Sequence, residues 1–223
     1  MFFLDRADAG RKLAQALIAY KGQSVVVYGL PRGGVVLAVE VAHILEAPLD
    51  LIVVRKIGHP RQPEYAIGAV AEDGYVVTNP DEVAVLDKCW LEGTIEAELK
   101  EAQRRRKVFL QGRPSVAVKD KVAIIVDDGL ATGLTMLAAI HEIRKRAPQK
   151  VVTAVPVAAA ETVHKLRSEV DDLVVLYIPE WFGAVGAFYQ YFPQISDDEV
   201  VMLMEAPVPS HQVTVQPAPL SDR

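Results

Sequence analysis

Cysteine is almost absent from this chain of 223 residues, since Cys89 is the only one. A single cysteine cannot form an internal disulfide bond, and Cys89 has no partners at the spacing of a zinc site. This usage is typical of a protein in a reducing compartment. We therefore expect a cytoplasmic protein.

Long apolar runs and an excess of basic charge are also missing. The longest apolar stretches, such as VVTAVPVAAA at residues 151–160, are far shorter than the roughly 20 residues of a membrane-spanning helix. The start of the chain, MFFLDRADAGRK, lacks the apolar segment of a signal peptide. The formal net charge of −5 gives no basic surface for nucleic acid or anionic lipid. We expect neither a membrane nor a nucleic-acid partner.

Apolar residues make up 51% of the chain, which is enough to fill a core. Short β-branched runs alternate with helical patterns, and this alternation predicts a parallel sheet that is buried on both faces. We predict an α/β fold with a doubly wound, mostly parallel sheet flanked by helices. The predicted strands are SVVVYG (24–29), LDLIVVRK (49–56), KVAIIVDD (121–128), KVVTAVPVAA (150–159) and DLVVLYIP (172–179).

Two segments do not fit the alternation of strands and helices, and they predict a small hood or insertion. Residues 65–79 indicate a hairpin that turns at Glu72-Asp73-Gly74, and residues 90–108 form a charged helix. That helix has an apolar stripe on one face and two i,i+4 ion pairs. The stripe is Leu91, Ile95, Leu99 and Ala102, and the pairs are Glu96/Lys100 and Glu101/Arg105.

The boundaries of the domain follow from these patterns. We expect one domain over residues 1–206, opened by an amphipathic helix at 6–20 and with a helical insertion at about 88–110. The basic run Arg104–Lys107 is interpreted as a solvated helix end, the alternative being a cap over the binding crevice. Residues 207–223 are rich in proline and lack periodicity, which predicts a disordered tail.

Unusual loops follow the predicted strands, at the edge where a doubly wound sheet binds its ligands. They are GLPRGG (29–34), RKIGHPRQPE (55–64), DDGLATGLT (127–135) and PEWFGAVGAFY (179–189). A glycine-rich loop that runs into a helix directs several N–H groups at one point, which is a phosphate site. Asp127 and Asp128 precede that loop and can accept hydrogen bonds from a diol. Together they describe a site for a ribose phosphate.

Two other interpretations of the same residues stay open at this point. An acidic residue at the end of a strand often caps the next helix, and Gly/Thr loops are common. A receiver-like domain also has an acidic pair after a strand, for binding Mg²⁺. It would have no evident use for the glycine loop.

The stretch VAIIVDDGLATGLTM (122–136) closely resembles the phosphoribosyl-pyrophosphate (PRPP) motif of type I phosphoribosyltransferases. The resemblance covers about residues 6–204, with GLPRGG at the family's pyrophosphate loop. The segments PRGG, VRKIG, PEYAIGAV and FGAVGAFYQYF resemble a bacterial subgroup whose acceptor is not assigned.

The resemblance implies a transfer of the 5-phosphoribosyl group of PRPP to a nitrogenous base, with release of pyrophosphate and with Mg²⁺ as cofactor. Asp127 and Asp128 would bind the ribose hydroxyls, and the metal indirectly or through the substrate. The loop Ala131, Thr132, Gly133, Leu134 and Thr135 would bind the 5′-phosphate. Arg32, Gly33 and Gly34 would bind pyrophosphate.

The catalytic task is to neutralise the leaving pyrophosphate, and basic residues suit it better than a nucleophile. Lys56 and Arg55 are the main candidates, with His59 and Arg61 as weaker ones. Glycine and two prolines interrupt residues 55–64, so we expect a mobile lid there. With Asp127 and Asp128, Lys56 and Arg55 make up the predicted catalytic set.

The sequence narrows the choice of acceptor base but does not identify it. Enzymes for 6-oxopurines carry an aspartate in the loop where this chain has Ala131, which speaks against hypoxanthine or guanine. Trp181 and Phe182, near Phe188 and Tyr189, are candidates for stacking on the base, although such a cluster is more often core. A PRPP-sensing regulator, another PRPP-using or nucleotide-releasing enzyme, and a homodimer all stay open.

Overall fold

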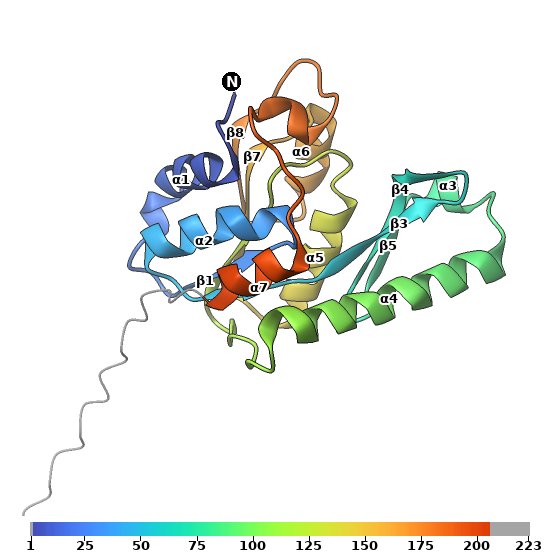
Figure 1. The fold of residues 1–223 in the computed structure, drawn as a ribbon, viewed down its shortest axis with the longest axis horizontal. Coiled ribbons are helices and arrows are strands. Elements are labelled where there is room, and N and C mark those ends of the chain that lie inside the picture. Colours follow the sequence, from blue (N-terminus) through green and yellow to red (C-terminus); the bar gives the residue numbers. More distant parts are fainter. Residues whose placement is uncertain (1, 206–223) are drawn as a thin grey trace, which may run out of the picture.

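The computed structural model describes residues 2–205 of the chain, so the predicted tail at 207–223 lies outside the described residues. Figure 1 shows a central sheet between helices and a second, smaller sheet to one side. The helical elements are α1 (Arg6–Ala16), η1 (Ile18–Tyr20), α2 (Gly33–Leu45), α3 (Pro80–Val83), α4 (Lys88–Leu110), α5 (Leu134–Lys145), α6 (Ala160–Leu166), η2 (Val185–Phe188) and α7 (Asp197–Glu205). The strands are β1 (Val25–Gly29), β2 (Leu49–Leu51), β3 (Val54–His59), β4 (Gln62–Ala71), β5 (Val76–Thr78), β6 (Val122–Val126), β7 (Lys150–Val157) and β8 (Asp172–Tyr177).

The central sheet has five parallel strands in the order β2-β1-β6-β7-β8. The strand order reverses between β1 and β6, because the chain first adds β2 on one side of β1 and then continues on the other side. This is a doubly wound sheet, as predicted. Its switch point lies between the carboxyl ends of β1 and β6, which is where such folds bind ligands.

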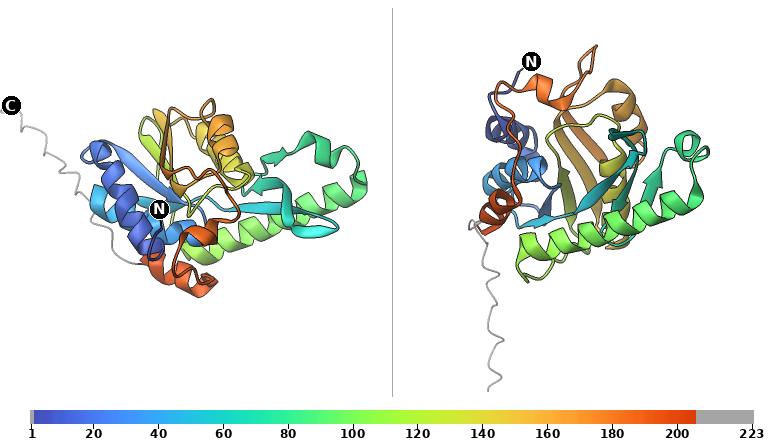
Figure 2. Two further views of the ribbon diagram at one scale, coloured as in Figure 1. Left: turned by 90° about the horizontal axis from the view of Figure 1, so that it is seen from above. Right: turned by 45° about the vertical axis from the view of Figure 1, so that its right-hand side comes forward.

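The central strands consist of unbroken apolar residues because both faces of the sheet are covered. In β1, Val25 and Val27 belong to the core that packs on α1 and α2. Val26 and Tyr28 point the other way, into the core beneath α5 and α6. Figures 1 and 2 show these two helical layers on opposite sides of the sheet.

The second sheet, which we call the hood, is antiparallel with the order β3-β4-β5. It projects from the central sheet with the long helix α4 beneath it (Figure 2). The predicted hairpin is confirmed, with Gly74 at the turn in the left-handed region (φ 89°). Three residues of the apolar stripe of α4 pack with Ile57, Ile67 and Val70 of the hood, namely Leu91, Ile95 and Leu99. The fourth, Ala102, packs in a separate cluster with Leu51 and Val53.

Residues 49–56 do not form one strand, and this prediction was wrong. The chain leaves the central sheet after β2 and enters the hood at Val54. Backbone N–H of Val53 donates to the Glu72 carboxylate (3.1 Å), and the Val53 carbonyl accepts from the Glu72 N–H (3.1 Å). Arg106 donates to the Leu51 carbonyl (2.6 Å). These distant residues bend the chain out of the sheet.

Two other expectations also need correction. Residues 55–64 are not irregular, because they belong to β3, β4 and the turn between them, with an irregular register at Gly58. That this segment moves as a lid stays a prediction. The prolines lie in the turn and near the start of β4, so they do not prevent pairing. The opening helix is shorter than 6–20, since α1 ends at Ala16 and a 3-10 turn follows.

The basic run at the end of α4 is only partly solvated, which corrects the interpretation of Arg104–Lys107. The Arg106 guanidinium forms ion pairs with the buried carboxylates of Asp50 (3.3 Å) and Glu72 (2.9 Å). The predicted pairs Glu96/Lys100 (2.6 Å) and Glu101/Arg105 (2.7 Å) are present. No helix of the described chain is long and apolar enough to cross a membrane.

Candidate active site

A cleft of about 910 Å³ lies at the switch point between β1 and β6. Its walls come from the loops after these two strands, from β3 of the hood and from α4. Most of the predicted site residues line it. They are Arg32, Gly33, Arg55, Lys56, Asp127, Asp128, Ala131, Thr132, Gly133 and Thr135.

The acidic pair follows β6 at the floor of this cleft. The Asp128 N–H donates to the Asp127 carboxylate (2.8 Å), so the loop holds the first side chain in place. Burial raises the pKa of Asp127 well above its ordinary value, and the neighbouring Asp128 raises it further. Burial also raises the pKa of Asp128, against the opposing effect of Arg6. A hydrogen-bond donor or a cation that enters the cleft would therefore stabilise the ionised form of both carboxyl groups.

The loop after the acidic pair forms a cradle of backbone donors. Within the described chain, the N–H groups of residues 132–135 have no hydrogen-bond acceptor, as expected for the first turn of a helix. Gly133 starts α5 with a φ of 76°, and an added Cβ would lie 2.6 Å from Thr162 Cγ2. The Thr162 hydroxyl also donates to the Ala131 carbonyl. The cradle can accept an anion beside the two carboxylates.

The loop after β1 packs closely on the acidic pair. A Cβ added to Gly33 would lie 1.9 Å from Asp128 Oδ2, and one added to Gly34 would lie 2.9 Å from Asp127 Oδ1. Only glycine leaves room for this approach. Gly34 lies behind the carboxylates and does not line the cleft. Arg32 lines the cleft and also reaches Asp197 of α7 (3.5 Å).

Basic residues of the hood face the acidic pair across the cleft. Lys56 lines the cleft with the two aspartates, and its positive charge opposes the rise in their pKa values. Arg55 is held by Glu98 of α4 (2.7 Å). His59 lines the cleft and accepts a hydrogen bond from the Arg61 N–H (3.1 Å), whereas Arg61 does not line it.

Arg6 is a cleft residue that the sequence analysis missed. Its Nε donates to Asp128 Oδ2 (2.8 Å), its Nη1 donates to the Pro193 carbonyl (2.6 Å), and its guanidinium lies 3.6 Å above the Phe192 ring. The Tyr189 hydroxyl donates to the Asp128 carbonyl (2.6 Å). No local pattern reveals these contacts, because Arg6 and Asp128 are 122 residues apart in the chain.

Besides Gly34 and Arg61, three further predicted residues do not line the cleft. Leu134 packs against Ala69 and Ala71 of the hood. The ring of Phe182 packs on that of Phe188 (5.5 Å between centroids), on the edge of the core. Trp181 is 89% exposed. A role of either aromatic residue in base stacking stays a prediction.

The fold and the cleft together define a class of protein. Doubly wound folds bind their ligands at this switch point, and a glycine-rich loop at the N-terminus of a helix is a common site for a phosphate.

The chain belongs to the phosphoribosyl transferase domain family, whose pattern matches residues 4–192. This confirms the resemblance to type I phosphoribosyltransferases and the expected fold. A Mycobacterium tuberculosis (strain CDC 1551 / Oshkosh) protein named "Putative phosphoribosyl transferase" is 47% identical over 205 residues, which are 91% of this chain and 46% of that protein. This chain thus spans about half the length of the curated relatives that it matches.

Two solved structures are also similar. The crystal structure of TT1426 from Thermus thermophilus has a TM-score of 0.76 and 41% identity, over 92% of this chain and 98% of that one. The AQ2163 protein from Aquifex aeolicus has a TM-score of 0.50 and 15% identity, over 78% and 74% of the two chains. The second likeness concerns the fold alone.

Proposed function

We propose that this chain is a magnesium-dependent phosphoribosyltransferase that uses PRPP and a nitrogenous base and releases pyrophosphate. The observation that supports it most is one cleft that unites an acidic pair, unpaired backbone N–H groups and a second glycine loop with an arginine. PRPP offers ribose hydroxyls, a 5′-phosphate and pyrophosphate in one molecule. Each of these parts has a chemically matching group in the cleft.

The acidic pair and the cradle would position the sugar. The carboxylates of Asp127 and Asp128 accept hydrogen bonds from the ribose hydroxyls. The backbone donors and hydroxyl groups of Thr132 and Thr135 bind the 5′-phosphate at the start of α5, where the helix dipole favours a negative charge. Held at both ends, the sugar turns its C1 toward the hood.

The reaction breaks the bond between C1 and the pyrophosphate oxygen, and the electron pair leaves with pyrophosphate. A ring nitrogen of the base forms the new bond to C1, and its proton passes to water or to the departing pyrophosphate. Positive charge develops on the sugar while the leaving group becomes more negative. Arg32, Arg55 and Lys56 stabilise the leaving group, which is the electrostatic term that such catalysis needs most.

Magnesium would offset the charge of pyrophosphate and help to orient it. The residues fit this ion, because Asp127 and Asp128 supply the carboxylate oxygens that it prefers. In the described part of the chain, no group of three or more His, Cys, Asp or Glu side chains is arranged for a metal. We therefore assign the remaining ligands to phosphate oxygens and water.

The loop that follows the acidic pair also indicates which base accepts the phosphoribosyl group. Enzymes for 6-oxopurines have a similar loop but carry an aspartate at the position that Ala131 occupies in this chain. We therefore expect adenine or uracil to serve better than hypoxanthine or guanine.

The test is calorimetry of PRPP binding, with and without Mg²⁺, for the wild type and the double variant Asp127→Asn/Asp128→Asn. We expect the double variant to bind PRPP about 100-fold more weakly, since each lost charged hydrogen bond contributes about 1.5 kcal/mol or more. Glu161→Gln, on an exposed face of α6, is the matched control and should bind normally. Equal affinity of the double variant and the wild type would refute the site.

Pyrophosphate release is then measured with a panel of bases. Release with one base would establish the enzyme and identify its acceptor. PRPP binding without release from any base would favour a sensor on the same fold.

A further inference from the structure

Arg6 is a buried cation in the wall of the cleft, and the reaction proposed above does not use it. Only 8% of its surface is exposed. Asp50 and Glu142 are also buried, but they lie outside the cleft in ion pairs with Arg106 and Arg146. A buried charge is costly unless other groups of the protein hold it. The partners of Arg6 therefore indicate what this residue is for.

Three groups fix the guanidinium of Arg6 in place. Asp128 Oδ2 accepts from its Nε (2.8 Å), the Pro193 carbonyl accepts from its Nη1 (2.6 Å), and the Phe192 ring lies 3.6 Å from its centre. A guanidinium group carries five N–H donors in one rigid plane. These contacts therefore also fix the direction of the donors that remain.

The contact between Arg6 and Asp128 consists of one hydrogen bond, although this pair of side chains can form two. In the two-fold contact, Nε and Nη2 donate side by side to the two carboxylate oxygens. Here Arg6 Nη2 and Asp128 Oδ1 have no hydrogen bond with the described residues, and neither is among the buried atoms that lack a partner. Both residues line the cleft. The two atoms are therefore open to a ligand.

A single hydroxyl group can satisfy both open atoms. A hydroxyl donates one hydrogen bond and also accepts hydrogen bonds. Between the two residues, it would accept from Arg6 Nη2 and donate to Asp128 Oδ1. An ionised phosphate suits this place less, because the carboxylate repels it. The open pair thus favours the hydroxyl of a sugar over an anion.

Tyr189 holds the backbone of the same aspartate. Its hydroxyl donates to the Asp128 carbonyl (2.6 Å). Its ring packs on the rings of Phe3 (5.5 Å between centroids) and Phe192 (4.8 Å). Arg6 and Tyr189, which we call the clamp, thus fix both the side chain and the main chain of Asp128.

We propose that the clamp positions Asp128 for the ribose of PRPP, and that Arg6 Nη2 and Asp128 Oδ1 bind one ribose hydroxyl between them. The inference rests on the proposed function, because it takes PRPP as the ligand. It adds two residues to the ribose site, one from α1 and one from the segment after η2. Lysine cannot replace Arg6, since an ammonium group has the charge but not the planar set of donors.

The test is calorimetry of PRPP and of pyrophosphate, both with Mg²⁺, for the wild type, Arg6→Lys, Asp128→Asn and the double variant. We expect Arg6→Lys to weaken PRPP binding about tenfold, the effect of losing one charged hydrogen bond. Pyrophosphate lacks the ribose hydroxyl and should bind as it does to the wild type. Arg11→Lys is the matched control, because Arg11 is an exposed arginine of the same helix and pairs with Glu40 (3.3 Å) outside the cleft.

The double variant shows whether Arg6 acts through Asp128. If it does, Arg6→Lys should weaken PRPP binding much less in the Asp128→Asn background than in the wild type, because the contact is already lost there. Tyr189→Phe keeps the ring and removes only the hydroxyl, so it should weaken PRPP binding about fivefold, the effect of one neutral hydrogen bond. If Arg6→Lys does not fold, Tyr189→Phe decides, and wild-type affinity of that variant would refute the clamp.

Three further results would overturn the proposal. Wild-type PRPP affinity of Arg6→Lys would show that the planar donors are not needed. Equal losses for PRPP and pyrophosphate would mean that the variant damages the cleft as a whole. Additive losses in the double variant would mean that Arg6 does not act through Asp128. In each case, weak PRPP binding by Asp128→Asn would leave the proposed function intact, whereas a wild-type chain that does not bind PRPP would refute both.

Discussion

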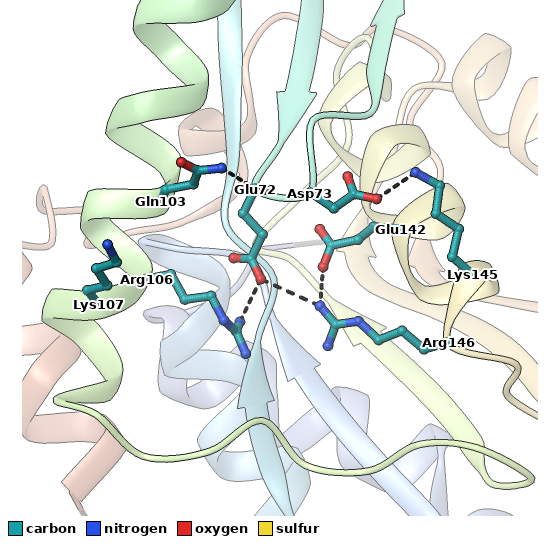
Figure 3. A pocket seen from close by; sticks show the side chains of 8 residues that line it. All are labelled: Glu72, Asp73, Gln103, Arg106, Lys107, Glu142, Lys145 and Arg146. Atoms are coloured by element: carbon teal, nitrogen blue, oxygen red, sulfur yellow. Dashed lines mark hydrogen bonds and ion pairs between the residues drawn. The ribbon is translucent and has the colours of Figure 1, made fainter.

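The two ends of α5 differ in whether the polar groups around them have partners within the protein. At the N-terminal end, backbone N–H groups of the loop have no acceptor in the described chain, and the two aspartates face an open cleft. At the C-terminal end, Lys145 and Arg146 form ion pairs with Asp73 and Glu72 of the hairpin turn, and Glu72 in turn pairs with Arg106 of α4 (Figure 3). The comparison teaches that charge content does not distinguish a binding site from a structural cluster. Backbone donors that are left without acceptors at the wall of an open cleft do.

The largest effect expected is on the structural end of the helix. Glu72→Gln should lower the free energy of unfolding by about 3 kcal/mol, because it leaves Arg106 and Arg146 without their shared, buried counter-charge. Urea denaturation measures this change. Glu96→Gln, whose exposed carboxylate pairs with Lys100, is the control and should change stability far less, because water and salt screen an exposed ion pair. Similar values for the two variants would show that the cluster is not structural.

The next effect concerns the opposite end of the helix. Gly33→Ala places a methyl group where Asp128 Oδ2 and Arg6 Nε now lie, at 1.9 and 2.8 Å. We expect PRPP affinity to fall about 100-fold, or about 2.7 kcal/mol, as the acidic pair is displaced. Gly93→Ala is the control, since an added Cβ there meets no atom within 4 Å. It should keep the affinity and raise stability by up to about 1 kcal/mol, because alanine favours the helix. Wild-type binding by Gly33→Ala would mean that the loop is not packed as described.

The smallest effect is a dependence on pH that belongs to Glu142. Burial raises the pKa of Glu142 from 4.5 to about 8. Between these values the folded protein keeps a proton that the unfolded chain releases, so this group lowers the free energy of unfolding as pH rises. Glu142→Gln has no such proton. Its stability relative to the wild type should rise between about pH 5 and pH 8, by at most about 1.4 kcal/mol per pH unit.

Denaturation at several pH values measures this difference. Glu161→Gln is the control, because Lys165 lowers the pKa of the exposed Glu161. Its relative stability should stay flat between pH 5 and pH 8, because a carboxyl group whose pKa is lowered from 4.5 titrates below that range. A flat difference for Glu142→Gln would mean that Glu142 is ionised in the folded state throughout.

The parts of the fold that the sequence predicts are those set by nearby residues. Apolar runs predict the central strands, and the acidic pair with its glycine loop predicts one side of the cleft. The break after Leu51 was missed because Glu72, 19 residues beyond Val53, imposes it. Arg106 was misjudged for the same reason, since its partner Asp50 lies 56 residues away. No pattern of neighbouring residues indicates that Arg6 lies in the cleft.

The Arg6 contacts also set when the cleft can be completed during synthesis. Arg6 reaches Asp128 and Pro193, which follow it by 122 and 187 residues. At about 5–20 residues per second, a ribosome needs roughly 10–40 s to supply the second partner. A growing chain therefore has most of its parallel sheet well before it has a finished cleft.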